Sequence, residues 1–176
     1  MAGFKLVGQV KGGLQAPGTM DLIIGDSETI YVGGAVELSG GYVGAAETGD
    51  KILGIVVGIV DKNGIDLDSC NSNNYDGTWT PGVNGVANYA AASDNTTDKQ
   101  IKAVVCIDKD ALWETACTSL AAAQRFGYFD LTDSVTMHAH AGNGMNGGQF
   151  QMIDFASATL GTFKIAESAL DAYAVS

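Results

Sequence analysis

The sequence AVELSGGYVGA, residues 35–45, has the form of a β-hairpin. Two short segments, residues 35–39 and 42–45, bracket Gly40-Gly41 at the spacing of a two-residue turn. Such a turn needs backbone conformations with positive φ, which glycine adopts without steric cost. We therefore expect two antiparallel strands joined at Gly40-Gly41.

The apolar segments on either side of this hairpin predict further strands. Residues 52–60 read ILGIVVGIV, and such a near-continuous apolar run is typical of a strand that is covered on both faces. A contact between subunits is one way to cover the second face. Upstream, Met20, Leu22 and Ile24 fall on one face of an expected strand, and residues 29–32 form another.

Strand patterns recur at intervals of about 8 to 12 residues through the rest of the chain, which indicates an all-β fold, a small β-barrel or a β-sandwich. Residues 112–117 fit either a strand, with Trp113 and Cys117 on one side, or the start of a helix. One short helix is expected over residues 120–126, with Thr118 or Ser119 as its N-cap. The remaining predicted strands cover residues 101–107, 128–131, 134–137, 149–153 and 162–166.

The length of 176 residues fits one domain. Residues 1–20 are interpreted as an N-terminal arm, with the first strand of the domain itself as the open alternative. Residues 21–176 are interpreted as a single β domain that contains a long surface insertion, residues 61–100. This insertion is rich in Asp, Asn, Ser and Gly, and long loops of this kind are usually functional or disordered.

Charge and hydropathy exclude several partners. The net charge is −11, whereas contacts to nucleic-acid phosphates need clustered Lys and Arg. The longest apolar run, residues 52–60, is far shorter than the roughly 20 residues of a membrane-spanning helix. The N-terminus shows no signal-peptide pattern. We expect no nucleic acid, no membrane, and synthesis in the cytoplasm.

The sequence offers few residues suited to metal binding or catalysis. His138 and His140 lie two residues apart near Asp133, and two histidines rarely make a metal site alone. Asp66, Asp68, Asn71 and Asn73 offer oxygen ligands without the spacing of a calcium loop. No nucleophile motif accompanies the histidines, so catalysis, metals and cofactors are not expected. Cys70, Cys106 and Cys117 share no metal-ligand spacing and are expected to be small buried apolar residues.

Two stretches carry a resemblance to a known family. AVELSGGYV, residues 35–43, and GDKILGIVVG, residues 49–58, resemble the corresponding stretches of the capsid decoration (cement) proteins of tailed bacteriophages. The likeness continues loosely through residues 89–93, 102–108, 113–114, 127–131 and 152–154. It implies a small β-barrel or β-sandwich with a short helix, and a homotrimer on the outer surface of the capsid that ties major capsid protein subunits together.

Six apolar or aromatic residues in segments expected at the surface are candidates for contacts with a partner. Phe4, Leu6, Val7 and Leu14 lie in the N-terminal arm, and extended apolar arms often order only against a partner. Tyr75 and Trp79 lie in the long insertion and suit a surface contact. Two other functions stay open: a phage tail or fibre component, and a module that binds a carbohydrate or a receptor through the Tyr75 and Trp79 loop.

Overall fold

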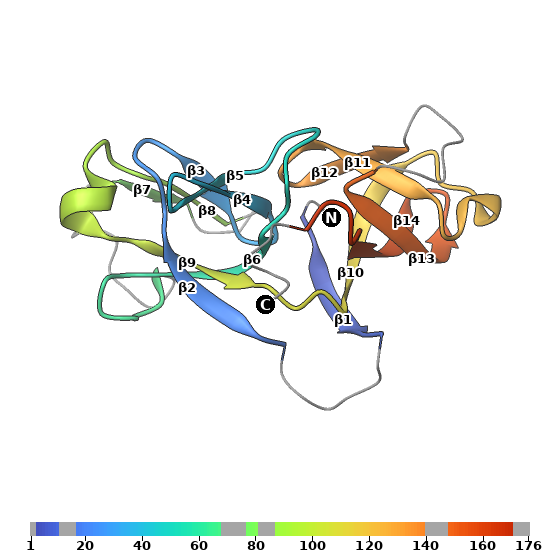
Figure 1. The fold of residues 1–176 in the computed structure, drawn as a ribbon, viewed down its shortest axis with the longest axis horizontal. Helices are drawn as coiled ribbons and strands as arrows, with labels where there is room; N and C mark the ends of the chain where they lie inside the picture. Colours follow the sequence, from blue (N-terminus) through green and yellow to red (C-terminus); the bar gives the residue numbers. More distant parts are fainter. Residues whose placement is uncertain (1–2, 11–16, 68–76, 81–86, 140–147, 171–176) are drawn as a thin grey trace.

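The computed structural model describes residues 3–10, 17–67, 77–80, 87–139 and 148–170 (Figure 1). These residues form an all-β protein with two short helical turns, as the strand spacing predicts. The strands are β1 (Lys5–Gln9), β2 (Thr19–Ile23), β3 (Thr29–Tyr31), β4 (Ala35–Ser39), β5 (Tyr42–Ala45), β6 (Gly54–Val60), β7 (Thr78–Thr80), β8 (Asn88–Ala90), β9 (Lys102–Cys106), β10 (Ala111–Thr118), β11 (Tyr128–Asp133), β12 (Thr136–Ala139), β13 (Phe150–Ser157) and β14 (Leu160–Ile165). The turns are η3, a π-helical turn (Asn95–Lys99), and η4, a 3₁₀ turn (Ala122–Gln124).

The C-terminal half of the chain closes into a β-barrel, on the right in Figure 1. Its strands follow the order β10-β12-β11-β13-β14, and β14 pairs with β10 to complete the circle. Trp113, Phe129 and Phe163 fill the interior, where the rings of Phe129 and Phe163 meet edge to face. β1 extends the barrel wall by pairing with β10.

The N-terminal half forms a second lobe, on the left in Figure 1. Its main sheet has the order β2-β9-β6-β4-β5 and curves until Ile24, just after β2, bridges Val43 in β5. A three-stranded sheet, β3-β8-β7, covers the same core, to which Ile30 and Tyr89 contribute fully buried side chains.

Three neighbouring strands form a wall that the two lobes share. In β4, β6 and β9, one residue points into the barrel core and the adjacent residue points into the core of the N-terminal lobe, because side chains alternate along a strand. The pairs are Ala35 and Val36, Ile55 and Val56, and Cys106 and Val105. The expected β domain is therefore built around two hydrophobic clusters that meet at one wall.

β6 confirms that residues 52–60 are buried on both faces. Ile55 and Val56 are both buried, one in each cluster. Val57 is the exception: a bulge between Val56 and Gly58 shifts the register, and the Val57 side chain is exposed. Since the chain itself covers both faces, β6 does not need a second subunit to bury it.

The Gly40-Gly41 hairpin is confirmed residue by residue. β4 and β5 pair antiparallel with Ser39 opposite Tyr42, and the two glycines have φ values of 59° and 88°. A Cβ on either glycine would meet no atom within 4 Å. The need for glycine here is conformational and not steric.

Replacing both turn glycines with valine is therefore expected to destabilise the protein by about 2 to 4 kcal/mol, since β-branched residues resist positive φ. Urea unfolding measures the loss. The matched variant Gly40→Asn/Gly41→Asn should lose much less, because asparagine tolerates the left-handed region. Equal stability of the valine variant and the parent would mean that the hairpin has another turn.

Three further expectations are settled by the structure. Residues 112–117 are a strand, β10, in which Trp113, Thr115 and Cys117 are buried on one side. The helix expected over residues 120–126 shrinks to the 3₁₀ turn η4. Neither Thr118 nor Ser119 caps it, since Thr118 still belongs to β10 and Ala121 is the residue before the turn.

The insertion, residues 61–100, is more regular than expected where the structure describes it. It contributes β7 and β8 to the three-stranded sheet and ends in η3. Asn95 fixes this end, because its fully buried side-chain amide donates to the carbonyls of Ile24 and Ile101 and accepts from the Ile101 N–H. The carboxyl-terminal part of the insertion is thus built into the N-terminal lobe.

Candidate interaction surfaces

The first half of the predicted arm is a barrel strand, which corrects the choice of Phe4 as a surface contact. Phe4 is 5% exposed and its ring stacks on Phe150 with centroids 4.7 Å apart. The Phe4 N–H donates to the Gly33 carbonyl at 2.7 Å. An aromatic ring gains more free energy inside the core than on the surface. Phe4 is therefore a structural residue.

The other arm candidates divide between core and surface. Leu6 packs partly buried against the barrel core, whereas the Val7 side chain is 48% exposed. Leu14 lies outside the described residues. Of the three arm candidates that the structure describes, Val7 is the exposed one.

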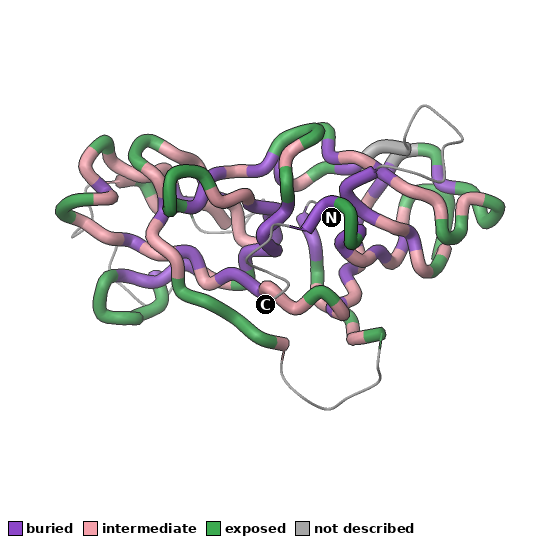
Figure 2. Tube along the Cα trace, viewed as in Figure 1, coloured by how far each residue is buried: buried purple, intermediate pink, exposed green. Residues whose placement is uncertain are grey.

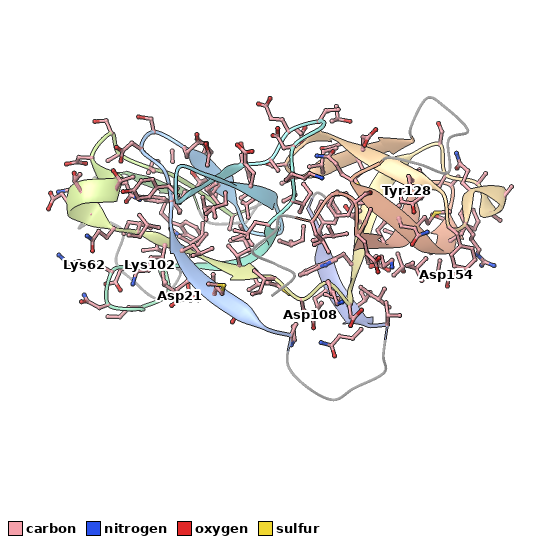
Figure 3. The ribbon with its side chains drawn as sticks, in the orientation of Figure 1. Asp21, Lys62, Lys102, Asp108, Tyr128 and Asp154 are labelled. Carbon is pink, nitrogen blue, oxygen red and sulfur yellow. The ribbon has the colours of Figure 1, made fainter. Side chains whose placement is uncertain are left out.

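Val7, Val10 and Met20 are exposed apolar side chains that flank the connection between β1 and β2, and they are here together called the arm surface. Both ends of that connection bind the β9–β10 turn. The Val10 N–H donates to the Asp110 carbonyl at 2.8 Å, and the Ile107 N–H donates to the Gly18 carbonyl at 3.0 Å. Figure 3 places Asp108 of this turn between β2 and β1. Of the three residues expected on one face of a single strand, Ile24 is buried, Leu22 is partly buried, and Met20, in the edge strand β2, is exposed.

The two aromatic candidates of the insertion have different outcomes. Tyr75 lies outside the described residues. Trp79 lies in β7 opposite Tyr89 and packs, half-buried, against the core of the N-terminal lobe. Most of its apolar surface is thus used within the chain.

The candidate metal ligands do not come together among the described residues. Asp66 is exposed, and the Asp133 carboxylate accepts the N–H of Val135 at 2.9 Å in a turn. His140, Asp68, Asn71 and Asn73 lie outside the described residues, and for His138 the backbone alone, in β12, is described. Within the described ranges, no three His, Cys, Asp or Glu side chains form a group that could hold a metal ion.

Cys106 and Cys117 are buried free thiols, as expected, and Cys70 lies outside the described residues. Burial raises the pKa of the Cys106 thiol above its ordinary value, because the thiolate would lose its hydration. A raised pKa keeps the thiol protonated at neutral pH and unreactive. Cys106 is thus a packing residue of the shared wall.

A crossing segment, residues 47–52, connects β5 with β6 and is tied to the barrel by polar contacts. It carries the Gly49-Asp50 part of the family-like stretch. Gln149, 3% exposed, donates through Nε2 to the carbonyls of Glu47 at 2.7 Å and Asp50 at 3.0 Å, and its Oε1 accepts the Leu131 N–H at 2.9 Å. Further contacts join Thr48 to the Leu131 carbonyl, Lys51 to the Ser168 carbonyl and the Ile52 N–H to the Ala169 carbonyl.

Gln149→Leu is expected to destabilise the protein by about 2 to 4 kcal/mol. The substitution conserves volume but leaves the buried Leu131 N–H without its Gln149 acceptor, which is costly. It also removes the donor to the part-buried carbonyls of Glu47 and Asp50, of which the Glu47 carbonyl keeps the Asp50 N–H. Denaturant unfolding measures the change. Gln151→Leu is the matched control, because its amide makes one exposed contact, to the Phe126 carbonyl, and should change stability by less than about 1 kcal/mol. Similar losses in both variants would contradict a special role for the buried amide.

No family model, curated protein or solved structure matches this chain. The fold defines the chain as an all-β protein with a closed five-stranded barrel. Among the described residues, no helix is both long enough and apolar enough to cross a membrane.

Sequence reasoning missed one exposed residue that the geometry singles out. Phe126 has the most exposed large apolar side chain in the described part of the chain, at 64%. The sequence predicts Phe126 as the last residue of a short helix, whereas it follows η4 in a left-handed conformation with φ 65°. Nothing in the local sequence signals this, since aromatic residues rarely adopt positive φ.

Proposed function

We propose that this chain is a structural virion protein that binds the outer surface of an assembled tailed-phage capsid and stabilises it by bridging major-capsid subunits. The observation that carries the proposal is the resemblance of residues 35–43 and 49–58 to capsid decoration proteins. These residues build β4, the first half of β5, residues 49–52 of the crossing segment and most of β6. The family-like stretch thus forms the part of the chain that joins the two lobes.

The distribution of exposed apolar side chains supports a bridging role. A homotrimer that bridges capsid subunits needs one contact region for the capsid and a separate one for its own copies. The arm surface lies beside the β9–β10 turn, and Phe126 lies next to η4 at the outer end of the barrel (Figure 1). The proposed function assigns the arm surface to the capsid and includes no catalytic step.

Binding to the assembled shell stabilises it by mass action. A ligand that binds only the assembled state contributes about 2.7 kcal/mol per site at a hundredfold excess over Kd. With a net charge of −11, the protein gains little from charge attraction unless the shell is basic. Binding through apolar packing and hydrogen bonds should persist at about 0.5 M salt, where the Debye length has fallen to about 4 Å.

Co-sedimentation with expanded phage heads stripped of accessory proteins tests the proposal. The protein should pellet with the heads at both 0.1 and about 0.5 M salt and should raise the temperature at which the heads fall apart. The variant Val7→Ser/Met20→Ser should bind at least about tenfold more weakly. Ile65→Ser is the matched control, since Ile65 is 50% exposed in the turn that follows β6, away from the connection between β1 and β2. Absence of binding by the parent protein would refute the proposed function, and full binding by the double variant would exclude the arm surface.

A further inference from the structure

The outer end of the barrel carries a rigid corner, residues 119–127, at the right-hand end of Figure 1. Leu120 anchors it: the side chain is buried in the barrel core, and its N–H donates to the Ala158 carbonyl at 2.9 Å. The Gln124 side chain accepts the N–H of Ala121 at 2.8 Å and closes the 3₁₀ turn. A buried side chain and a backbone hydrogen bond of Leu120 therefore hold the corner on the barrel.

Phe126 stands at the end of this corner in a strained conformation. Its φ of 65° is rare for an aromatic residue. The backbone is held there because the Phe126 N–H donates to the Met152 carbonyl at 2.8 Å, and the Phe126 carbonyl accepts from the Gln151 side chain at 3.2 Å. The ring nevertheless gains little burial inside the chain, since 64% of the residue is exposed. Backbone strain that is not offset by local packing is typical of functional positions.

The segments around Phe126 expose mostly small side chains, alanines together with Ser119, Ser157 and Thr159, and their two charges cancel. Exposed alanines surround the corner, both on it and on the β13–β14 hairpin that Leu120 contacts. They are Ala121, Ala122, Ala123, Ala156 and Ala158. Across residues 117–127 and 154–161 the charged residues are Arg125 and Asp154, and these two form an ion pair at 2.8 Å. Figure 3 shows Asp154 on the outer side of the barrel.

We propose that this neutral corner, with Phe126 as its anchor, is the surface through which one copy of the chain binds another. Copies with a net charge of −11 repel one another, so a self-contact is favoured where charges are absent or cancelled. A basic partner would instead be drawn to the acidic surface elsewhere. Exposed aromatic side chains held in one conformation are the usual anchors of such contacts.

This inference deepens the proposed function by locating the contact of the expected homotrimer. It rests on self-association alone and does not require that the capsid be the partner. In a closed ring of copies, the same corner is used once by every subunit. Loss of the anchor should therefore dissociate the assembly as a whole.

Sedimentation velocity of the whole chain over a range from about 1 to 100 µM tests the inference. The parent protein should sediment as an oligomer, and Phe126→Asn should sediment as a monomer, with a dissociation constant raised at least about 30-fold. Asparagine suits the left-handed conformation, so the monomeric variant should keep the near-ultraviolet circular dichroism of a folded barrel. Phe126→Tyr, which keeps the ring, should still associate.

Tyr42→Ser is the matched control, because Tyr42 is an exposed aromatic residue of the other lobe. It should leave the oligomer unchanged. A monomeric parent, an oligomeric Phe126→Asn variant, or dissociation by both substitutions would overturn the inference. If the chain oligomerises through Phe126 but does not bind phage heads, the inference is supported and the proposed function is refuted.

Discussion

Deletion of residues 1–9 is expected to unfold the C-terminal barrel. The deletion removes the β1–β10 pairing, the N–H of Phe4 that binds Gly33, and the Gly3 carbonyl that accepts the buried Thr115 hydroxyl. Truncating one buried phenylalanine costs about 3 to 5 kcal/mol, and the total stability of a domain is about 5 to 15 kcal/mol. The combined loss should exceed what the barrel can tolerate.

Near-ultraviolet circular dichroism and urea unfolding measure this effect. The single variant Phe4→Ala should already lose about 3 to 5 kcal/mol. Val7→Ser/Val10→Ser is the control in the same segment: both side chains are about half exposed, and the change should be within about 1 kcal/mol. A deletion variant that melts like the parent would show that residues 1–9 are the detachable arm that the sequence alone suggests.

Gly54→Ala is expected to have the second large effect, a loss of at least about 3 kcal/mol. A Cβ at Gly54 would lie 2.2 Å from the Cys106 carbonyl oxygen and 2.7 Å from Val105 Cγ1. The first obstacle is backbone of the neighbouring strand, so it cannot rotate away. Relief requires β6 and β9 to separate, and both strands belong to the shared wall.

Gly58→Ala provides a control within the same strand. There a Cβ would meet the Val104 side chain at 3.8 Å, an ordinary contact. The variant should match the parent or gain a few tenths of a kcal/mol, because alanine has less conformational freedom to lose than glycine. Thermal and urea unfolding compare the two variants. Equal behaviour would mean that β6 and β9 do not approach closely at Gly54.

The strands could be predicted because their signals are local. The Gly40-Gly41 turn needs positive φ, and the alternation in residues 112–117 fits a strand with Trp113, which is buried, on one face, although the same residues also fit the start of a helix. These features depend on residues within a few positions of one another. The fold class followed from their number and spacing.

The sequence left open whether the N-terminus is an arm or the first strand of the domain, because the choice, decided for the strand, depends on contacts far apart in sequence. The apolar character of Phe4 is visible in the sequence, but its stacking partner Phe150 is nearly a whole chain length away. For Phe126, the local sequence indicates the wrong structure. Its neighbours form a good helical pattern, and the hydrogen bond to the Met152 carbonyl that ends the turn comes from another strand.

The shared wall also determines how the two lobes can move. Tandem domains joined by a flexible linker change their separation freely, whereas here the junction consists of hydrogen-bonded strands with a packed core on each side. Figure 2 shows buried residues continuing through the middle of the molecule from one lobe to the other. A hinge at this place would break the β4–β6–β9 ladder. The chain therefore behaves as a rigid spacer, in which the distance from the π-helical turn at one end to the 3₁₀ turn at the other is set by backbone geometry.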